Sequence, residues 1–186
     1  MSHGTFMLVL GLFAAANDAR IPNIFEALNT TERTYIYSTS LNREDYVCAS
    51  YTKRKILCPY QDCFYYIRYH HGNSSKGTWM YGEIQNPCRF NGYSEYPCLL
   101  RMDVSDFNTT KTVKELERRV LMSWHRHPGC GVYVVLDGNR TRGCELHARQ
   151  KALEQREVTS LIHCEADFYK YCKNDIQIAQ YSENCN

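Results

Sequence analysis

The chain has 186 residues, of which 44% are apolar, and its 22 basic and 20 acidic side chains leave a formal charge of +2. This length suits one compact domain with a real core, and even a core that contains a hollow. The near-neutral balance argues against nucleic-acid binding, for which a basic face is expected. Because 15 tyrosines outnumber 7 phenylalanines, many of the aromatic side chains end in a hydroxyl group, which suits partly solvated sheet faces and polar-lined pockets.

The N-terminus is predicted to be a secretory signal. Residues 6–16 form an apolar run of signal-peptide length, with Ala14 and Ala16 placed for cleavage. The run is too short to span a membrane, and no other stretch could do so. We therefore expect a signal peptide over 1–19, cleaved near 16–19, and a single domain over 20–186. Because no Lys or Arg precedes the run, a buried N-terminal helix is the alternative.

Short strands are predicted for most of the mature chain. Residues 21–29 favour about one helical turn, and 113–118 favour strand or loop. Alternating patterns bounded by turn residues predict strands over 34–40, 46–53, 64–70, 78–85, 99–104, 119–124, 131–136 and 144–149. The turn signal Asp137-Gly138-Asn139 joins the last two. The chain therefore reads as eight short antiparallel strands.

A helix is predicted over 159–173, with Thr159 or Ser160 as its N-cap. The residues that fall on one side of it at helical spacing are Leu161, Cys164, Phe168, Tyr171 and Cys172. Eight strands followed by one helix predict an all-β fold, a closed up-and-down barrel with a C-terminal helix against its wall. A barrel of eight strands has an interior that can hold one small ligand.

Cysteines and sequons both indicate export. Ten cysteines in a chain of this length are typical of a disulfide framework, which persists in oxidising compartments. Four Asn-x-Ser/Thr sequons lie in polar, turn-like stretches and predict a glycoprotein. The predicted glycosylation sites are Asn29, Asn73, Asn108 and Asn139.

No catalytic pattern is present. The sequence lacks the serine-hydrolase elbow, the zinc-protease helix motif, the phosphate-binding loop and the dinucleotide fingerprint. We therefore assign no catalytic residue, metal ligand or cofactor, and expect a protein that is not an enzyme. Histidines at 70, 71, 125 and 127 could be drawn as a metal site, but exposed turn histidines explain them better.

Glu145 and His147 are the most interesting polar pair. They lie two apart on a predicted strand and so share a face, while Leu146 and Ala148 share the other. In a simple half-buried strand Leu146 points to the core and Glu145 to solvent. The alternative is that Glu145 lies in a cavity, where it accepts a hydrogen bond from a ligand's ammonium or hydroxyl group, with His147 beside it.

The order of several short segments is characteristic. They are FEALNTTERTYIYSTS at 25–40, YVCASYTK at 46–53, CGVYVV at 130–135, GCELH at 143–147 and SENC at 182–185. In this order and with this cysteine spacing, the chain resembles the tick salivary lipocalins over essentially its whole mature length. The resemblance implies an eight-stranded calyx secreted in saliva that captures host mediators such as histamine, serotonin, leukotrienes, thromboxane or cholesterol. Some members of that family act on complement or dendritic cells.

The resemblance also implies disulfide pairs. By position these are Cys48–Cys185, Cys130–Cys164 and Cys144–Cys172. For the remaining cysteines we favour the local pairs Cys58–Cys63 and Cys88–Cys98, although the crossed pairings remain open.

The family pattern bears on the ligand. Biogenic-amine binders carry an acidic residue directly after the strand-seven cysteine, then Glu-Leu and an aromatic residue; here Gly131 replaces the acid and His147 the aromatic residue. An ammonium in a dry cavity needs a charge partner, so the missing acid weakens the amine hypothesis. If Gly131 faces inward, Tyr133 and Val135 do too, and the aromatic residues that we expect to add to this wall are Tyr35, Tyr37, Trp79, Tyr81 and Trp124. Such a lining suits a sterol or fatty-acid derivative, as in the cholesterol-binding, dendritic-cell-modulating branch called Japanin.

The leading hypothesis from sequence is a secreted, monomeric lipocalin that sequesters a hydrophobic or amphipathic host mediator, a sterol or an eicosanoid, and dampens inflammation or immunity. Glu145 and His147 are its expected polar anchor. One alternative keeps the fold and makes the ligand histamine or serotonin. The other is a protein–protein inhibitor whose disulfide-bonded loops, 58–63 and 88–98, bind a host receptor, protease or complement factor.

Overall fold

The computed structural model describes residues 21–42, 47–57, 63–70, 77–90, 92–103, 115–138, 140–154, 161–173 and 176–185. At positions 57, 63–69, 78, 79, 102, 103, 115 and 116 it describes only the backbone. The predicted signal peptide, the sequon residues Asn73, Asn108 and Asn139, and Cys58 lie outside these residues. Among the described residues, no helix is long and apolar enough to cross a membrane.

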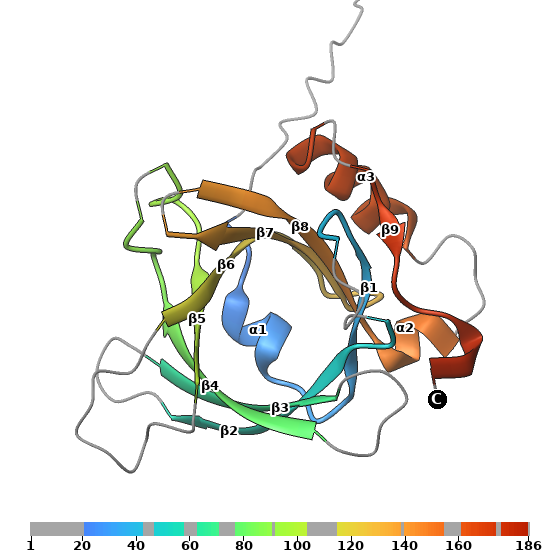
Figure 1. Ribbon diagram of the computed structural model, residues 1–186, viewed down its shortest axis with the longest axis horizontal. Helices are drawn as coiled ribbons and strands as arrows, with labels where there is room; N and C mark the ends of the chain where they lie inside the picture. The colour runs from blue at the N-terminus through green and yellow to red at the C-terminus, as the bar shows by residue number, and fades with distance from the viewer. Residues whose placement is uncertain are drawn as a thin grey trace, which may run out of the picture.

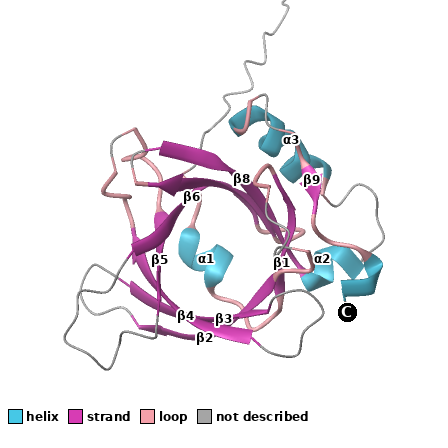
Figure 2. Ribbon diagram, viewed as in Figure 1, coloured by secondary structure: helices cyan, strands magenta, loops and turns pink. Residues whose placement is uncertain are grey.

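Strands dominate the described chain (Figures 1 and 2). The strands are β1 (Thr34–Thr39), β2 (Ser50–Leu57), β3 (Cys63–His70), β4 (Gly77–Gln85), β5 (Cys98–Asp103), β6 (Glu115–His125), β7 (Cys130–Asp137), β8 (Arg140–Arg149) and β9 (Ile178–Ala179). The helices are α1 (Ile24–Leu28), α2 (Gln150–Glu154), α3 (Ile162–Tyr171) and the short 3-10 turn η3 (Glu183–Cys185). The predicted all-β class is confirmed, whereas α2 and β9 were not predicted.

All strand pairings are antiparallel and follow the order β2-β3-β4-β5-β6-β7-β8-β1-β9. Strand β1 pairs with β8 along its length and also with β2 through Thr34↔Tyr51 and Tyr35↔Ser50. The sheet curves strongly, and α1 lies on its inner side (Figure 1). We call this inner side the concave side and the outer side the convex side.

Strand β2 begins later than its pattern predicts, at Ser50 rather than near 46. Cys48 lies in a turn with φ of 57°, and its N–H donates to the carbonyl of Gln180 at 2.8 Å. The backbone at Cys48 is therefore hydrogen-bonded to the C-terminal segment, and the chain joins the sheet only from Ser50 onward.

The helix α1 packs on the concave side. Asn23 caps it, accepting a hydrogen bond from the Glu26 N–H at 3.1 Å. The apolar residues that share a buried cluster with it, the concave cluster, are Ile24, Ala27, Leu28, Tyr51, Ile84, Leu99, Leu121 and Tyr133. Because these side chains come from α1 and from five strands, the inner faces of the strands hold the helix in place.

The predicted C-terminal helix, α3, packs on the convex side against β6, β7 and β8. Its predicted apolar stripe is buried at Leu161, Cys164, Phe168 and Cys172. The N-cap is Leu161, which makes no side-chain capping bond, so the helix begins later than the predicted caps at 159 or 160. Those two residues lie outside the described chain.

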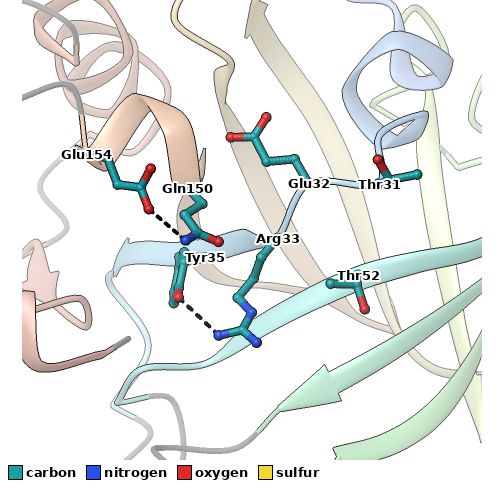
Figure 3. Close-up of a pocket in the computed structure, with 7 residues that line it drawn as sticks. All are labelled: Thr31, Glu32, Arg33, Tyr35, Thr52, Gln150 and Glu154. Atoms are coloured by element: carbon teal, nitrogen blue, oxygen red, sulfur yellow. Dashed lines mark hydrogen bonds between the residues drawn. The ribbon is translucent and has the colours of Figure 1, made fainter.

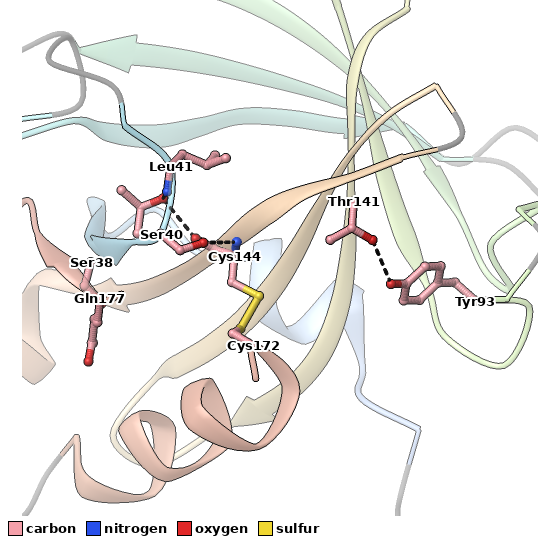
Figure 4. The surroundings of a disulfide bond; sticks show 9 residues. Ser38, Ser40, Leu41, Tyr93, Thr141, Cys144, Cys172 and Gln177 are labelled. Carbon is pink, nitrogen blue, oxygen red and sulfur yellow. Dashed lines mark hydrogen bonds between the residues drawn. A yellow bond between two sulfur atoms is a disulfide. The ribbon is translucent and has the colours of Figure 1, made fainter. Parts of the chain in front are cut away.

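Disulfides attach the C-terminal part to the sheet. Cys130–Cys164 and Cys144–Cys172 join β7 and β8 to α3, and Cys48–Cys185 joins the turn before β2 to the C-terminus. These are the pairs that the family resemblance implies, and Cys88–Cys98 is the favoured local pair. Around Cys144, the end of β1 adds a polar contact, since the Cys144 N–H donates to Ser40 Oγ at 2.8 Å (Figure 4). Cys58 lies outside the described residues and only the backbone of Cys63 is described, so the pair Cys58–Cys63 stays a prediction.

Candidate ligand-binding site

Residues 130–136 of β7 and 143–148 of β8 are buried on both faces of the sheet, so the burial of Leu146 does not force Glu145 toward solvent. Leu146 packs in the convex core, while Glu145 and His147 face the concave side with 0% and 2% exposure. Neither face of β8 meets solvent here, because α3 covers the convex side. Glu145 is therefore buried even though Leu146 also points to a core.

A network of buried charged side chains crosses the concave side from β5 to β8. The Arg119 guanidinium donates two hydrogen bonds to the Glu145 carboxylate, from Nε to Oε2 at 2.6 Å and from Nη2 to Oε1 at 2.9 Å. Glu117 bridges the guanidinium groups of Arg101 and Arg119. All four side chains are at most 7% exposed. We call Arg101, Glu117, Arg119, Glu145 and His147 the concave charge network.

The charge state of Glu145 follows from this geometry. Burial alone would raise the pKa of its carboxyl, but the Arg119 guanidinium and the bond from His147 outweigh burial and hold the pKa far below its usual range. The carboxylate is therefore ionised at neutral pH. Both of its oxygens already accept protein hydrogen bonds.

His147 connects the network to two aromatic rings. Its Nε2 lies 2.8 Å from Glu145 Oε2, and its Nδ1 lies 3.1 Å from the Tyr51 hydroxyl. Its ring is 4.5 Å from that of Tyr133, centroid to centroid. Burial lowers the pKa of His147, so the imidazole is neutral. Because a carboxylate can only accept, Nε2 carries the proton and Nδ1 accepts from Tyr51.

Acidification should destabilise the fold through His147. Below about pH 6.5 an unfolded histidine binds a proton, whereas the folded His147 stays neutral because its pKa is lowered. The unfolded state then binds more protons, so the free energy of unfolding falls as the pH falls, by at most about 1.4 kcal/mol per pH unit. Urea unfolding between about pH 7 and pH 5 should show this slope.

His147→Gln should flatten that slope, and His127→Gln, at an exposed turn residue, is the matched control. Equal slopes in the wild type and in His147→Gln would contradict the prediction. At still lower pH, protonation of unfolded carboxylates adds a loss from Glu145, because its folded pKa is also lowered.

Gly131 has a steric role. It pairs with Trp124 across β6 and β7. A Cβ at this position would lie 2.5 Å from the Ser123 carbonyl oxygen and 2.9 Å from Cε3 of Trp124. The indole therefore occupies the space that an acidic side chain would need. Packing explains why this chain has glycine where the amine-binder pattern has an acid, because Trp124 and a side chain at position 131 would occupy the same space.

Five of the predicted wall and anchor residues lie together on the concave side: Trp124, Tyr133, Val135, Glu145 and His147. Tyr133 and Val135 share a face with Gly131 because β7 alternates without interruption between them. Trp79 lies on β4, but its side chain is outside the described part of the chain.

Tyr35 and Tyr37 are placed differently from the expectation. The Tyr35 hydroxyl donates to the Cys185 carbonyl at 3.2 Å, and its ring meets Tyr181 edge-on at 4.9 Å. Tyr37 also faces Tyr181, at 6.4 Å. Both rings point to the convex side because Ile36, which pairs with His147, takes the concave side. They hold the C-terminal segment and do not join the concave wall.

Tyr81 is a second correction of the same kind. It lies between Met80 and Gly82 on β4, whereas Met80 and Ile84 pack with the concave cluster. Alternation therefore directs Tyr81 to the convex side. The predicted aromatic wall is smaller than the sequence suggested.

Sequence reasoning missed Tyr51, Arg101, Glu117 and Arg119. Residues 113–118 were predicted only as strand or loop, and the predicted strand began at Arg119. The available signal was that Glu117, Arg119 and Leu121 alternate on one face. Nothing in the spacing of Arg101 marked it as a partner of Glu117.

A separate polar pocket lies outside this site, between β1, β2 and α2 (Figure 3). Its volume is about 450 Å³, and it is lined by Thr31, Glu32, Arg33, Tyr35, Thr52, Gln150 and Glu154. The side chains of Gln150 and Glu154 bond each other at 2.7 Å. Arg33 donates to the Tyr35 hydroxyl at 3.3 Å.

Metal ligation finds no support in the described chain, where no three His, Cys, Asp or Glu side chains are grouped to hold an ion. Of the histidines considered, His125 bonds Asp167 on α3 at 2.7 Å and so joins the helix to β6.

Comparison with known proteins identifies the fold. The curved antiparallel sheet, with one helix on its concave side and a disulfide-bonded helix on its convex side, defines a fold like that of the tick salivary lipocalins. AM182 in its serotonin complex matches with a TM-score of 0.62 and 11% identity, over 91% of this chain and 96% of that one. Japanin from Rhipicephalus appendiculatus bound to cholesterol matches with a TM-score of 0.50 and 11% identity, over 86% and 98%. No family model and no curated sequence matches. At this identity the likeness establishes the fold alone.

Proposed function

We propose that this protein is a non-enzymatic, secreted lipocalin that captures one small, neutral, amphipathic molecule, such as a sterol, on the concave side of a closed eight-stranded calyx. The observation that carries the proposal is the concave charge network beside an apolar, aromatic cluster. Apolar rings would cover the hydrocarbon part of the ligand, and nearby polar groups would bond its oxygen. Pairing of β1 with both β8 and β2 supports a closed barrel.

Charge balance favours a neutral ligand. The guanidinium groups of Arg101 and Arg119 match the carboxylates of Glu117 and Glu145, and His147 is neutral. An ammonium or a carboxylate placed beside these four groups would bring a charge without a counter-charge, which is costly in a buried site. An eicosanoid, which carries a carboxylate, is therefore less favoured here than a sterol.

A biogenic amine is the second candidate. The AM182 structure, which contains serotonin, supports it through the shared fold. Glu145 is the carboxylate that would receive the ammonium, but it would first have to give up bonds to Arg119 or His147. Amine binding thus requires the network to rearrange, whereas binding of a neutral ligand does not.

Export and host function belong to the same proposal. The disulfide framework supports an oxidising compartment, and cleavage near 16–19 with glycosylation at the four sequons would complete secretion into saliva. Sequestration of a host mediator would then dampen inflammation or immunity. The loop-mediated protein inhibitor is the remaining alternative, and binding to immune cells by a protein with an empty concave side would favour it.

Mass spectrometry of organic extracts from the purified protein tests the ligand class. A co-purified sterol or other neutral lipid is the expected result. Absence of extractable lipid, combined with tight histamine or serotonin binding in calorimetry, would overturn it. Glu145→Gln distinguishes the two ligand classes. The variant should bind an amine much more weakly but a sterol with little change in affinity, provided that thermal unfolding shows that it is folded. Glu154→Gln, at an exposed residue of α2, is the matched control.

A further inference from the structure

Trp124 is held rigidly at the edge of the concave cluster. It follows a bulge in β6 between Leu121 and Ser123 and lies opposite Gly131. The missing Cβ at Gly131 lets the indole approach the β7 backbone. On another side the guanidinium carbon of Arg149 lies 4.9 Å from the ring centroid, while Arg149 Nη2 donates to the Glu26 carbonyl of α1 at 2.7 Å. The ring is thus fixed by β7, β8 and α1 together.

The polar atom of this ring has no hydrogen-bond partner in the part of the chain that the structure describes. Trp124 Nε1 is buried and has no hydrogen-bond acceptor among the described residues. A buried indole N–H normally finds an acceptor, and leaving it unmet costs about 1–3 kcal/mol. By contrast, Tyr51 bonds His147, and His147 bonds Glu145. The buried Nε of Arg149, which lies over the same indole, also lacks a hydrogen-bond partner among the described residues, but among the described aromatic side chains of the site only Trp124 has such an atom.

We propose that Trp124 Nε1–H is the specificity-determining donor of the site and bonds an acceptor oxygen of the ligand, a hydroxyl or a ketone. This inference rests on the proposed capture of a neutral amphipathic molecule. It moves the main polar contact away from Glu145, whose oxygens are occupied by Arg119 and His147. An indole N–H cannot accept, so a ligand whose polar group only donates, such as an ammonium, gains nothing from it.

Matched sterols that differ only in their oxygen test the proposal. Cholesterol carries a hydroxyl, cholestenone carries a ketone, and the hydrocarbon cholestane carries no oxygen. Each is delivered from cyclodextrin. The wild type should bind cholesterol and cholestenone roughly tenfold more tightly than cholestane, the value of one net hydrogen bond. In Trp124→Phe, which keeps an aromatic ring at this position, the ratio of the two affinities should fall to about one.

Nuclear magnetic resonance gives a readout that does not depend on a variant. Nitrogen-labelled protein has two indole N–H signals because it has two tryptophans, and Trp79→Phe assigns them. The Trp124 signal should move downfield with cholestenone and stay near its free position with cholestane. This test stands even if Trp124→Phe fails to fold.

The outcomes separate the two proposals. Binding of all three sterols with equal affinity, and an unmoved Trp124 signal, would overturn the role of Trp124 while the sterol function stands. If none of the three binds, the sterol function and the inference both fall. A preference for oxygenated sterols that persists in Trp124→Phe would assign the donor to another residue.

Discussion

Arg119→Met should lower the free energy of unfolding by about 3–5 kcal/mol, the usual cost of breaking a buried ion pair by removing one partner. Arg119 is 1% exposed, grips both oxygens of Glu145 and also contacts Glu117. Methionine fills similar space but leaves two buried carboxylates sharing one guanidinium, that of Arg101. Urea unfolding at neutral pH measures the loss.

Arg118→Met is the matched control, since it makes the same change one residue away on the same strand. Arg118 faces the other side, where its guanidinium carbon lies 4.9 Å from the Phe90 ring centroid. Its replacement should cost no more than about 1 kcal/mol. If the two variants lose equal stability, Arg119 does not balance buried charge.

A second variant separates charge from packing. Arg119→Met combined with Glu145→Leu removes one charge of each sign and leaves the Arg101–Glu117 pair intact. It should be more stable than Arg119→Met alone, because no unpaired carboxylate remains. A double variant less stable than the single one would show that shape, and not charge, sets the cost.

Among the described disulfides, removal of Cys48–Cys185 should cause the largest fall in the free energy of unfolding. This pair spans 137 residues, against 10 for Cys88–Cys98. The restriction that a bridge places on the unfolded chain grows with the loop it closes, which gives about 5 kcal/mol for the long loop and about 3 kcal/mol for the short one. Denaturant unfolding of the two paired Cys→Ala variants measures this order.

The long bridge also holds the C-terminal segment in place. Tyr35 bonds the Cys185 carbonyl, and β9 pairs with β1 through Ser38↔Ala179 and Thr39↔Ile178. We therefore expect limited proteolysis to release this segment in the Cys48→Ala, Cys185→Ala variant before the sheet unfolds. Equal stability losses in the two paired variants, with the segment still protected, would refute the prediction.

The sequence predicted much of the fold because its signals are local. Alternation along each strand and helical spacing at Cys164, Phe168 and Cys172 depend on neighbours a few residues away. The same alternation placed Glu145 and His147 on one face of β8 and Tyr133 and Val135 on one face of β7, and the pairing of Tyr133 with Glu145 shows that both faces belong to the concave side. Errors occurred at boundaries: β2 begins late because Cys48 bonds to the C-terminal segment, and α3 begins late at Leu161.

The faces of the strands were harder to predict than the strands. Tyr35, Tyr37 and Tyr81 are apolar enough for either side of the sheet, and α3 with the C-terminal segment buries the convex side over β1, β6, β7 and β8. When both sides are buried, hydrophobicity no longer tells them apart. Only the pairing of Ile36 with His147 assigns Tyr35 and Tyr37 to the outside.

The sequence by itself determined the class of fold, the order of its strands, the C-terminal helix and the shared face of Glu145 and His147, but it left open whether that face is buried. Tertiary structure decided what those two residues bond to. Arg119 on β6 bonds Glu145 from 26 residues away along the chain, and Glu117 links Arg119 to Arg101 on β5. It also decided why residue 131 is glycine, since the indole of Trp124 fills the space beside it. Contacts between separate strands depend on register and burial, and no spacing along one strand encodes them.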